Sequence, residues 1–206
     1  MEKFYLEKPS LERKEEAIEY INEHVEANST PNGCGGLNRV NHGVTYEEWL
    51  KDVLRCEEKA YAESKGLVPG TTYFTIRESD NKIIGMVNFR YYLNEELLRF
   101  GGHIGYGIRP TERRKGYAKI QLYMSLEAAG KLNIDKIMVS CVDTNIGSEK
   151  TIVALDGIYE RTEEVEKYGN VKVYWIDVEK SIEKYKDIYG KYIRENNIKR
   201  KWYKCR

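Results

Sequence analysis

Apolar residues recur at helical spacing in some stretches of the chain and on alternate positions in others, which predicts alternating helices and strands. After a short apolar start at 4–6, a first amphipathic helix with a solvated acidic face is predicted from Pro9 onward. Its expected buried positions are Ala17, Ile18, Ile21 and Val25. A loop rich in Gly and Asn follows at 28–45, and a second helix is predicted over 46–62. The expected buried positions of this second helix are Trp49, Val53 and Leu54.

The rest of the chain is predicted to build a mixed sheet. Strand patterns at 71–77 and 83–92 flank a turn-rich segment and predict a hairpin, and a third strand follows at 103–109. Helical spacing resumes after Gly116, with Ala118, Leu122, Leu126 and Ala129 on one face. The remaining predicted elements are a strand, a helix and a second hairpin at 136–142, 146–155, 158–166 and 171–178.

These elements predict an α/β fold class. Strand, helix and strand over 103–142 form a βαβ unit, so we expect the two strands to be parallel neighbours. The mixed sheet therefore has an antiparallel meander, a central βαβ unit and a C-terminal hairpin, flanked by helices. With 206 residues, of which 41% are hydrophobic, the chain fits one domain at 1–178 followed by an appendage at 179–206.

Positive and negative charges nearly balance over the whole chain, but they are unevenly distributed along the sequence. The 34 Lys and Arg against 33 Asp and Glu give no overall attraction to nucleic acid or to an acidic membrane. Residues 179–206, however, carry ten cations against four carboxylates. This segment is either a basic, aromatic arm for RNA or another polyanion, or a final helix over 181–197 packed on the domain with a frayed basic end. We favour the packed helix and expect no nucleic-acid partner, because no nucleic-acid module accompanies the run.

Cysteine usage and the N-terminus indicate a cytoplasmic protein. Cys34, Cys56, Cys141 and Cys205 show no spacing that would assemble a zinc site, so we expect reduced thiols and no metal. The densely charged first 16 residues contain no apolar signal region. No run of about 18 apolar residues exists that could span a membrane.

The segment HIGYGIRPTERRKGYA, at 103–118, carries the clearest chemical signal. A helix beginning at Gly116 leaves its first N–H groups unpaired at the positive end of the helix dipole. Glycine allows an anion to approach the backbone, and Arg113, Arg114 and Lys115 add cationic donors at the same point. The arrangement suits a diphosphate, although taken alone it is equally compatible with a solvated loop before a helix.

Two further features favour a ligand. Gly105 and Gly107 interrupt the preceding strand, and such glycines often mark a bulge or a close backbone approach by a ligand. A bulge would splay this strand from the one at 136–142 and expose backbone groups that could bind an extended amide. Asn145 and Ser148, on the loop into the next helix, could bond the same molecule. A long amide-bearing arm that ends in a diphosphate describes coenzyme A.

At this point the sequence resembles the GNAT N-acetyltransferase superfamily. Arg113, Gly116 and Ala118 match the family's pyrophosphate motif, G-Y-G-I-R-P resembles its fourth strand, and V-D-T-N-I-G-S-E-K-T-I resembles its fifth strand and the following helix. The order of elements agrees over about residues 1–178. Within the superfamily, stretches such as LVPGTTYF and the closing VYWI look most like predicted bacterial acetyltransferases whose substrates are undefined.

The resemblance implies an N-acetyltransferase that moves an acetyl group from acetyl-CoA, its co-substrate, to the primary amine of a small molecule or a peptide by direct attack. Ile108 would supply main-chain bonds to the pantetheine arm, and the segment around Gly116 would cradle the pyrophosphate. The implied cofactor-binding residues are Ile108, Arg109, Arg113, Arg114, Lys115, Gly116, Tyr117, Ala118, Lys119, Asn145 and Ser148. The alternative is a non-catalytic acyl-CoA-binding or sensor protein. Exposed strand edges of such a fold would permit a homodimer.

Catalysis requires a base for the amine and benefits from an acid for the departing thiolate. His103 lies where many relatives carry a glutamate base, and it is the predicted base; otherwise it is a strand histidine bonded to a nearby loop. The relatives' acid, a tyrosine, aligns with Val153 here, which is the feature that favours the non-catalytic alternative. Tyr106 is the predicted acid, with Tyr159, Tyr174 or solvent as substitutes.

The acceptor site is expected between the first two helices and the loops at 28–45 and 93–102. Glutamates there could attract a cationic amine: Glu47, Glu48, Glu95 and Glu96.

Overall fold

Two separate sheets form the framework of the protein. The structure is a computed structural model that describes residues 1–195. The first sheet has four strands in the order β1-β2-β3-β4, and the second has three in the order β5-β7-β6, all paired antiparallel. The strands are β1 (Phe4–Glu7), β2 (Gly70–Arg77), β3 (Lys82–Arg90), β4 (Ile104–Ile108), β5 (Lys136–Val142), β6 (Ile158–Val165) and β7 (Gly169–Asp177).

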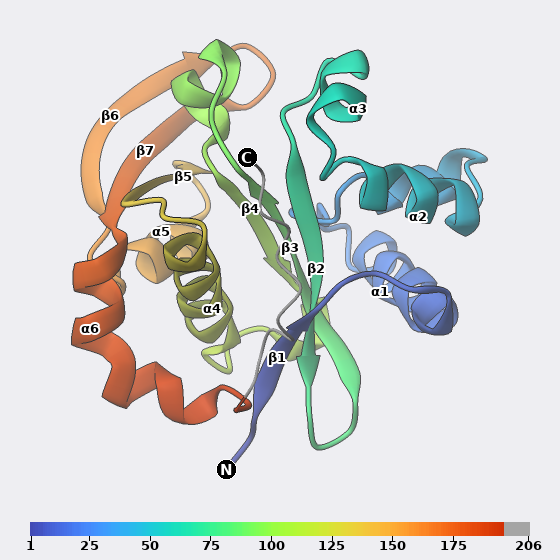
Figure 1. Cartoon of the computed structure of the whole chain (residues 1–206), viewed down its shortest axis with the longest axis horizontal. Coiled ribbons are helices and arrows are strands. Elements are labelled where there is room, and N and C mark those ends of the chain that lie inside the picture. Colours follow the sequence, from blue (N-terminus) through green and yellow to red (C-terminus); the bar gives the residue numbers. More distant parts are fainter. Residues whose placement is uncertain (196–206) are drawn as a thin grey trace.

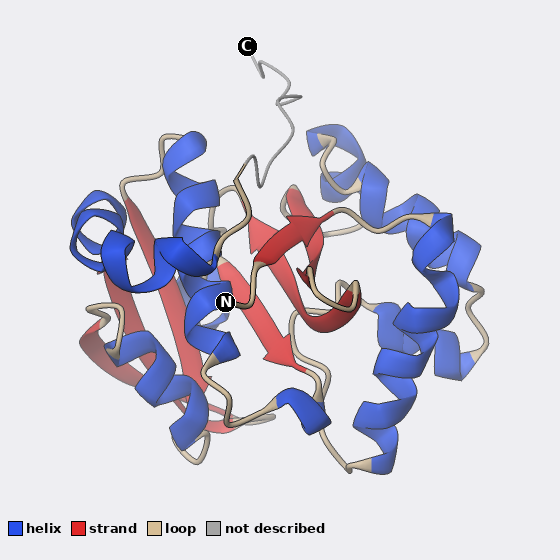
Figure 2. Ribbon diagram, turned by 90° about the horizontal axis from the view of Figure 1, so that it is seen from below, coloured by secondary structure: helices blue, strands red, loops and turns tan. Residues whose placement is uncertain are grey.

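Helices cover the sheets in layers (Figures 1 and 2). They are α1 (Lys14–Glu26), α2 (Tyr46–Arg55), α3 (Lys59–Ser64), α4 (Tyr117–Lys131), α5 (Ile146–Val153) and α6 (Val178–Tyr189). Shorter helical turns are η1 (Leu11–Arg13), η2 (Leu37–His42), η3 (Leu97–Gly101), η4 (Pro110–Glu112) and η5 (Gly190–Tyr192). One hydrophobic cluster joins α1 and α2 to one face of the first sheet, and a second joins α4, α5 and the second sheet to the other face.

The predicted βαβ unit has the right elements, but its strands do not pair as neighbours. β4 is the edge of the first sheet and β5 is the edge of the second. The expectation of one mixed sheet with parallel central strands was therefore wrong for this pair. The two strands touch at the start of β4, where the His103 N–H donates to the Met138 carbonyl at 2.8 Å.

Several local expectations also differ from the structure. The apolar start is a strand, β1, that pairs with β2. The predicted helix at 46–62 is two helices, because α2 ends at Arg55 and α3 begins only at Lys59. Val25 is 65% exposed and Leu54 is 41% exposed, whereas Leu50 is buried in place of Leu54. A capping box between Thr45 and Glu48 fixes the start of α2.

The segment after β7 packs against the rest of the chain. The buried side chains of Val178 and Ile193 belong to the same hydrophobic cluster as α4. Phe4 forms a parallel bridge with Ile193, and the Arg194 N–H donates to the Phe4 carbonyl at 2.9 Å. This agrees with a final packed helix, although α6 and η5 end at Tyr192. The basic run from 196 onward lies outside the described residues.

Candidate functional site

β4 and β5 diverge from a closed end at His103. There the His103 N–H donates to the Met138 carbonyl at 2.8 Å, and the Met138 N–H donates to His103 Nδ1 at 2.9 Å. At the two ends of β4, the Arg90 N–H donates to the His103 carbonyl and the Arg109 N–H to the Ile84 carbonyl, both at 2.8 Å. In an antiparallel sheet, every second residue of a strand directs its backbone N–H and C=O groups to the same neighbouring strand. Because His103 and Arg109 bond β3, the N–H and C=O groups of Tyr106 and Ile108 point away from β3. These groups face the side on which β5 lies.

Further along β4, the strand lies close to the start of α5. Tyr106 and Ser148 share a hydrogen bond of 2.9 Å between their hydroxyl groups. Asn145 caps α5 by accepting a hydrogen bond from the Ser148 N–H at 3.1 Å. Burial raises the pKa of Tyr106, so its hydroxyl stays protonated at neutral pH and can donate a proton. The structure thus assembles Tyr106, Asn145 and Ser148 at one place.

The start of α4 forms an exposed, cationic helix terminus. Gly116 caps the helix with a φ of +85°, and Arg114 also has a positive φ, at +66°. Arg113, Arg114, Lys115 and Gly116 are all exposed. A Cβ placed on Gly116 would meet nothing within 4 Å, so the space in front of the helix is open. Unpaired N–H groups, the helix dipole and this open space fit the diphosphate of coenzyme A.

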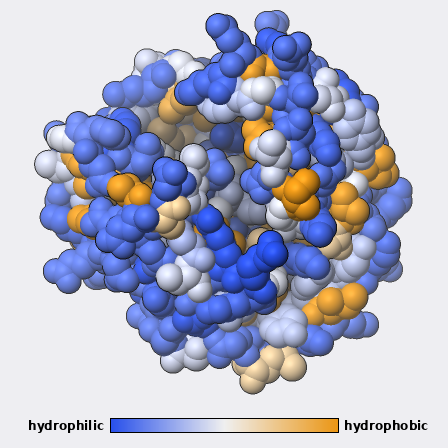
Figure 3. All heavy atoms as spheres, turned by 180° about the vertical axis from the view of Figure 1, so that it is seen from behind, coloured by the Kyte–Doolittle hydropathy of each residue, from blue (hydrophilic) through white to orange (hydrophobic). Residues whose placement is uncertain are grey.

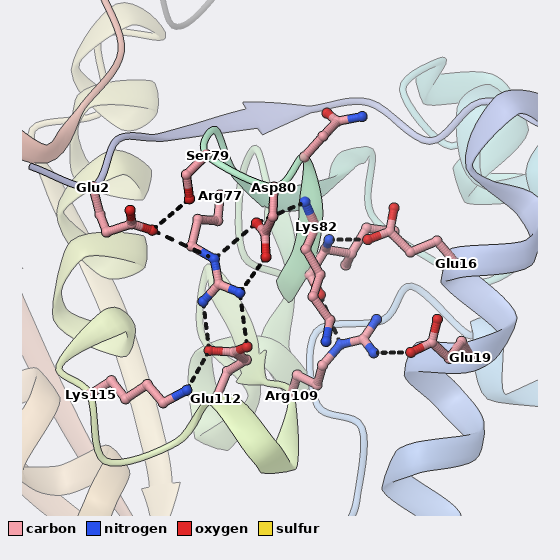
Figure 4. A network of polar contacts seen from close by, with 12 residues as sticks. Glu2, Glu16, Glu19, Arg77, Ser79, Asp80, Lys82, Arg109, Glu112 and Lys115 are labelled. Atoms are coloured by element: carbon pink, nitrogen blue, oxygen red, sulfur yellow. Dashed lines mark hydrogen bonds and ion pairs between the residues drawn. The ribbon is translucent and has the colours of Figure 1, made fainter.

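A partly buried ion-pair network holds this terminus in position (Figure 4). Arg77, at the end of β2, donates to Glu112 at 2.8 and 3.1 Å and to Asp80 at 2.6 Å. Glu112 in turn accepts from Lys115 Nζ at 2.9 Å. Burial alone would raise the pKa of Glu112, but the hydrogen bonds and charges of Arg77 and Lys115 hold it below its ordinary value. Nothing in the sequence pattern indicated this network, because the pair of Arg77 and Asp80 is far along the chain from the pair of Glu112 and Lys115.

Arg113 joins the terminus to two other elements. Its Nε donates to the Ile108 carbonyl at 3.1 Å, and its Nη2 donates to Ser29 Oγ at 2.6 Å. The Ile108 carbonyl is one of the groups directed into the gap. A ligand that uses this carbonyl must therefore compete with Arg113.

The assignment of Arg109 to cofactor binding was wrong for its side chain. The guanidinium is fully buried, and its Nη1 lies 2.8 Å from Glu19 and 3.1 Å from Glu23 on α1. Its Nε donates to the Ile83 carbonyl at 2.9 Å. These contacts turn the side chain toward α1, on the face of the sheet opposite α4. Tyr117 also points into the core, against Phe4 at a ring distance of 4.9 Å, while Ala118 and Lys119 are half-buried in the first turn.

The hydrogen bonds of His103 fit a structural role and not that of a catalytic base. The Met138 N–H occupies the Nδ1 lone pair, so the ring proton of the neutral imidazole is assigned to Nε2. Burial and the nearby Arg90 charge lower the pKa of His103 to about 4. Neither nitrogen is then free to take a proton from an amine near neutral pH. The alternative of a strand histidine with a bonded ring fits the geometry.

The glycines of β4 form neither the bulge nor the ligand contact that the sequence predicted. The register between β3 and β4 runs without a shift, so there is no bulge at Gly105 or Gly107. Instead, the loop after α1 lies directly on the strand. A Cβ on Gly107 would lie 2.6 Å from the Asn32 carbonyl oxygen, and a Cβ on Gly33 would lie 2.5 Å from the Gly105 oxygen. The predicted close approach is real, but the approaching backbone belongs to the chain itself.

The predicted acceptor glutamates on α2 are held by structural contacts. Glu47 pairs with Lys14 at 2.7 Å, and Glu48 accepts from the backbone and hydroxyl of Thr45 at 2.8 Å. Glu95 and Glu96 are exposed beside η3.

The two tyrosines predicted as substitutes for Tyr106 as the acid have other hydrogen-bond partners. The Tyr174 hydroxyl donates to Glu149 at 2.7 Å, and the Tyr159 hydroxyl shares a hydrogen bond of 3.0 Å with Thr162.

Seen from behind, the surface is hollowed near its centre, and much of the rim of this hollow is hydrophilic (Figure 3). Within residues 1–195, no three His, Cys, Asp or Glu side chains gather as metal ligands. In the same residues, no helix is long and apolar enough to cross a membrane.

Comparison with known proteins defines the family. Residues 43–157, more than half of the chain, match the model of the acetyltransferase (GNAT) domain. The chain belongs to this family. No curated protein matches the chain with significance.

Solved structures of the family share the fold. A GNAT-family acetyltransferase from Bacillus anthracis superposes with a TM-score of 0.57 at 18% identity, over 86% of this chain and 96% of that one. The microcin C7 self-immunity acetyltransferase MccE, in complex with acetyl-CoA and AMP, gives 0.61 at 17% identity, over 85% and 92%. A chimera of the Vibrio cholerae spermidine N-acetyltransferase SpeG and hSSAT gives 0.59 at 14%, over 87% and 98%.

Proposed function

We propose that this chain is an acetyl-CoA-dependent N-acetyltransferase. The observation that carries the proposal is the gap between β4 and β5, which leads from the backbone groups of Ile108 to the exposed cationic start of α4 at Gly116. An extended amide-bearing arm fits the first part of this path, and a diphosphate fits the second. MccE, a relative with the same fold, was solved with acetyl-CoA.

The residues of the gap divide the binding between them. The N–H and C=O groups of Ile108 and Tyr106 pair with the amides of the arm, and Asn145 and Ser148 line its other side. Arg113, Arg114 and Lys115, together with the first N–H groups of α4, bind the diphosphate. Arg113 leaves the Ile108 carbonyl as the arm enters. The bound thioester supplies an activated acetyl group.

The chemistry is direct attack by a primary amine of a small molecule or a peptide. An alkylammonium with a pKa of about 10.4 must first lose a proton, and with His103 bonded to Met138 this proton passes to water. The neutral amine then attacks the thioester carbonyl carbon to form the carbon–nitrogen bond, its nitrogen releases a second proton to water, and the carbon–sulfur bond breaks. Tyr106 donates its hydroxyl proton to the departing thiolate and recovers one from solvent. A spermidine N-acetyltransferase among the neighbours is an example of an amine acceptor on this fold.

A non-catalytic acyl-CoA-binding protein is the second candidate. The observation that favours it is the loss of His103 as a base, together with Val153, 52% exposed, where relatives carry a tyrosine acid. The two candidates share the cofactor site and differ only in turnover. Release of free thiol from acetyl-CoA in the presence of a panel of amines separates them.

The experiment is a calorimetric titration with acetyl-CoA and CoA, comparing wild type with Gly116→Glu and Gly116→Ala. Both variants bear the cost of a side chain at a positive φ, about 1 kcal/mol of stability, but only Glu places a negative charge in front of the helix. We expect Gly116→Glu to lower the affinity about a hundredfold or more, and Gly116→Ala to lower it only severalfold. Equal affinity in wild type and Gly116→Glu would remove the cofactor site from this terminus.

A further inference from the structure

A second concave surface lies on the other side of the molecule, between α2, α3 and η2. Residues 48, 51, 52 and 55 lie on one face of α2 at helical spacing. They line one side of a hollow of about 590 Å³, whose other side is formed by residues of α3 and η2. The side chains that shape it include Arg39, Lys51, Asp52, Arg55, Tyr61 and Lys65. None of these residues belongs to the gap between β4 and β5.

Both carboxylates of this hollow are already engaged. Glu48 accepts from the Thr45 N–H and hydroxyl, each at 2.8 Å, as part of the helix cap. Asp52 accepts a hydrogen bond from the Tyr61 hydroxyl and lies 3.7 Å from Arg39. Four cations, Arg39 included, therefore face two carboxylates, of which Glu48 is held by the helix cap and Asp52 by Tyr61 and Arg39. The net charge of the hollow is positive.

Three of the cations form no close ion pair in the described part of the chain. Within residues 1–195, the side chains of Lys51, Arg55 and Lys65 form no hydrogen bond and no ion pair within 4 Å, and Lys65 interacts with Asp52 only at longer range. The Arg55 guanidinium lies over the Tyr61 ring, 3.9 Å from its centroid, and Lys65 Nζ lies 5.5 Å from the same centroid. Stacking fixes the plane of the guanidinium while its N–H groups stay at the edge, free to donate.

We propose that this hollow binds an oxyanion, the phosphate or carboxylate group of a small molecule. The planar edge of Arg55 offers two parallel N–H donors to such a group, and Lys51 and Lys65 add charge on either side. Gly43, at the rim, has open space in front of its backbone, so a ligand can approach there. The hollow also borders the loop that lies on β4, since Arg39 Nε donates to the Gly36 carbonyl at 3.2 Å.

The test is a calorimetric titration of the full chain with inorganic phosphate at constant ionic strength, in wild type, Arg55→Gln and Lys186→Gln. Lys186 is exposed on α6 and makes no ion pair within the described part of the chain, so its substitution is a matched change of charge. We expect Arg55→Gln to weaken phosphate binding about fivefold or more and Lys186→Gln to leave it within about twofold. Equal affinities in the two variants would overturn the proposal.

Two further arms separate this site from the start of α4. Phosphate binding that survives Arg55→Gln and is lost in Arg113→Gln would place the anion at α4 and also overturn the proposal. Acetyl-CoA binding is expected to be unchanged in Arg55→Gln, so the two sites succeed or fail independently. Lys51→Gln changes an exposed side chain that forms no hydrogen bond or ion pair within the described residues, and it replaces Arg55→Gln if that variant unfolds. Titration with succinate shows whether phosphate or carboxylate is preferred.

Discussion

The two sides of β4 are built by different means. On the side toward β5, the candidate site consists of backbone groups, one helix terminus and two capping residues, all within 103–119 and 145–148. On the side toward α1, the strand is covered by the loop with Asn32 and Gly33, and Arg109 is buried against Glu19 and Glu23. The first side is built mainly from backbone groups and helix caps, and the second mainly from side-chain and loop contacts between distant residues. The predictions below test this difference.

The largest loss of stability is expected at His103, where the two sides of β4 meet. Replacing it by Ala removes the acceptor for the buried Met138 N–H and leaves a cavity beside Trp175, so the variant should lose about 3 kcal/mol of stability. Turnover should fall less than about tenfold, because the ring does not take the amine proton. Urea unfolding and steady-state kinetics measure the two quantities.

His103→Asn is the control for this prediction. Its side-chain oxygen can accept from the same N–H, so it should recover part of the stability. A loss of turnover above about a hundredfold in His103→Ala with normal stability would return His103 to the role of a base.

A smaller effect is expected on the side toward α1, and the two glycines of β4 provide a matched pair. In Gly107→Ala the new methyl would lie 2.6 Å from the Asn32 backbone oxygen, which cannot move without the loop, and we expect a loss of about 2 kcal/mol. In Gly105→Ala the closest atom is 3.6 Å away, an ordinary contact, so stability should stay within about 1 kcal/mol. Equal stabilities of the two variants, measured by urea unfolding, would show that the loop does not rest on the strand.

The same difference decides how much the sequence could predict. Capping and glycine signals act over a few residues, so the start of α4 at Gly116 could be predicted, and so could the position of Asn145 just before α5. Hydrophobic spacing also found most strands, including β5 with its bounds. The pairing of β4 with β5 was not foreseen correctly, because a strand pattern does not say at which edge a sheet ends.

Side-chain partnerships between distant elements were beyond the sequence. Arg109 follows the strand motif directly and looked like a phosphate ligand, but its partners, Glu19 and Glu23, are on α1. His103 had the chemistry of a base, and only the position of the Met138 N–H showed that its lone pair is used. Gly107 correctly signalled a close approach, although the pattern could not distinguish a ligand from the protein's own loop.

A still smaller effect on stability is expected at Glu112, which supports the start of α4 through Arg77 and Lys115. At pH 7, Glu112→Gln should lose about 1.5 kcal/mol, because Arg77 and Lys115 lose a charged partner. The folded pKa of Glu112 lies below its ordinary value of 4.5, so its contribution is present above that pH and is lost as the pH falls through the folded pKa. The difference between wild type and variant should therefore shrink on acidification. A difference that stays constant from pH 7 to pH 3 in urea unfolding would contradict the network.

The smallest effect is expected for Tyr106, and it tests the open end of the gap. Tyr106→Phe removes the proton donor and should lower turnover about tenfold, whereas Ser148→Ala removes only the partner of that hydroxyl. A thiol with a pKa of about 8.5 can leave without help, which limits the size of the loss. If Tyr106 acts as the acid, turnover in Tyr106→Phe should be slower than in Ser148→Ala at saturating acetyl-CoA. This difference in turnover should become smaller with an acyl donor that has a more acidic thiol. Equal turnover in the two variants would mean that the Tyr106 hydroxyl serves only to join β4 to α5.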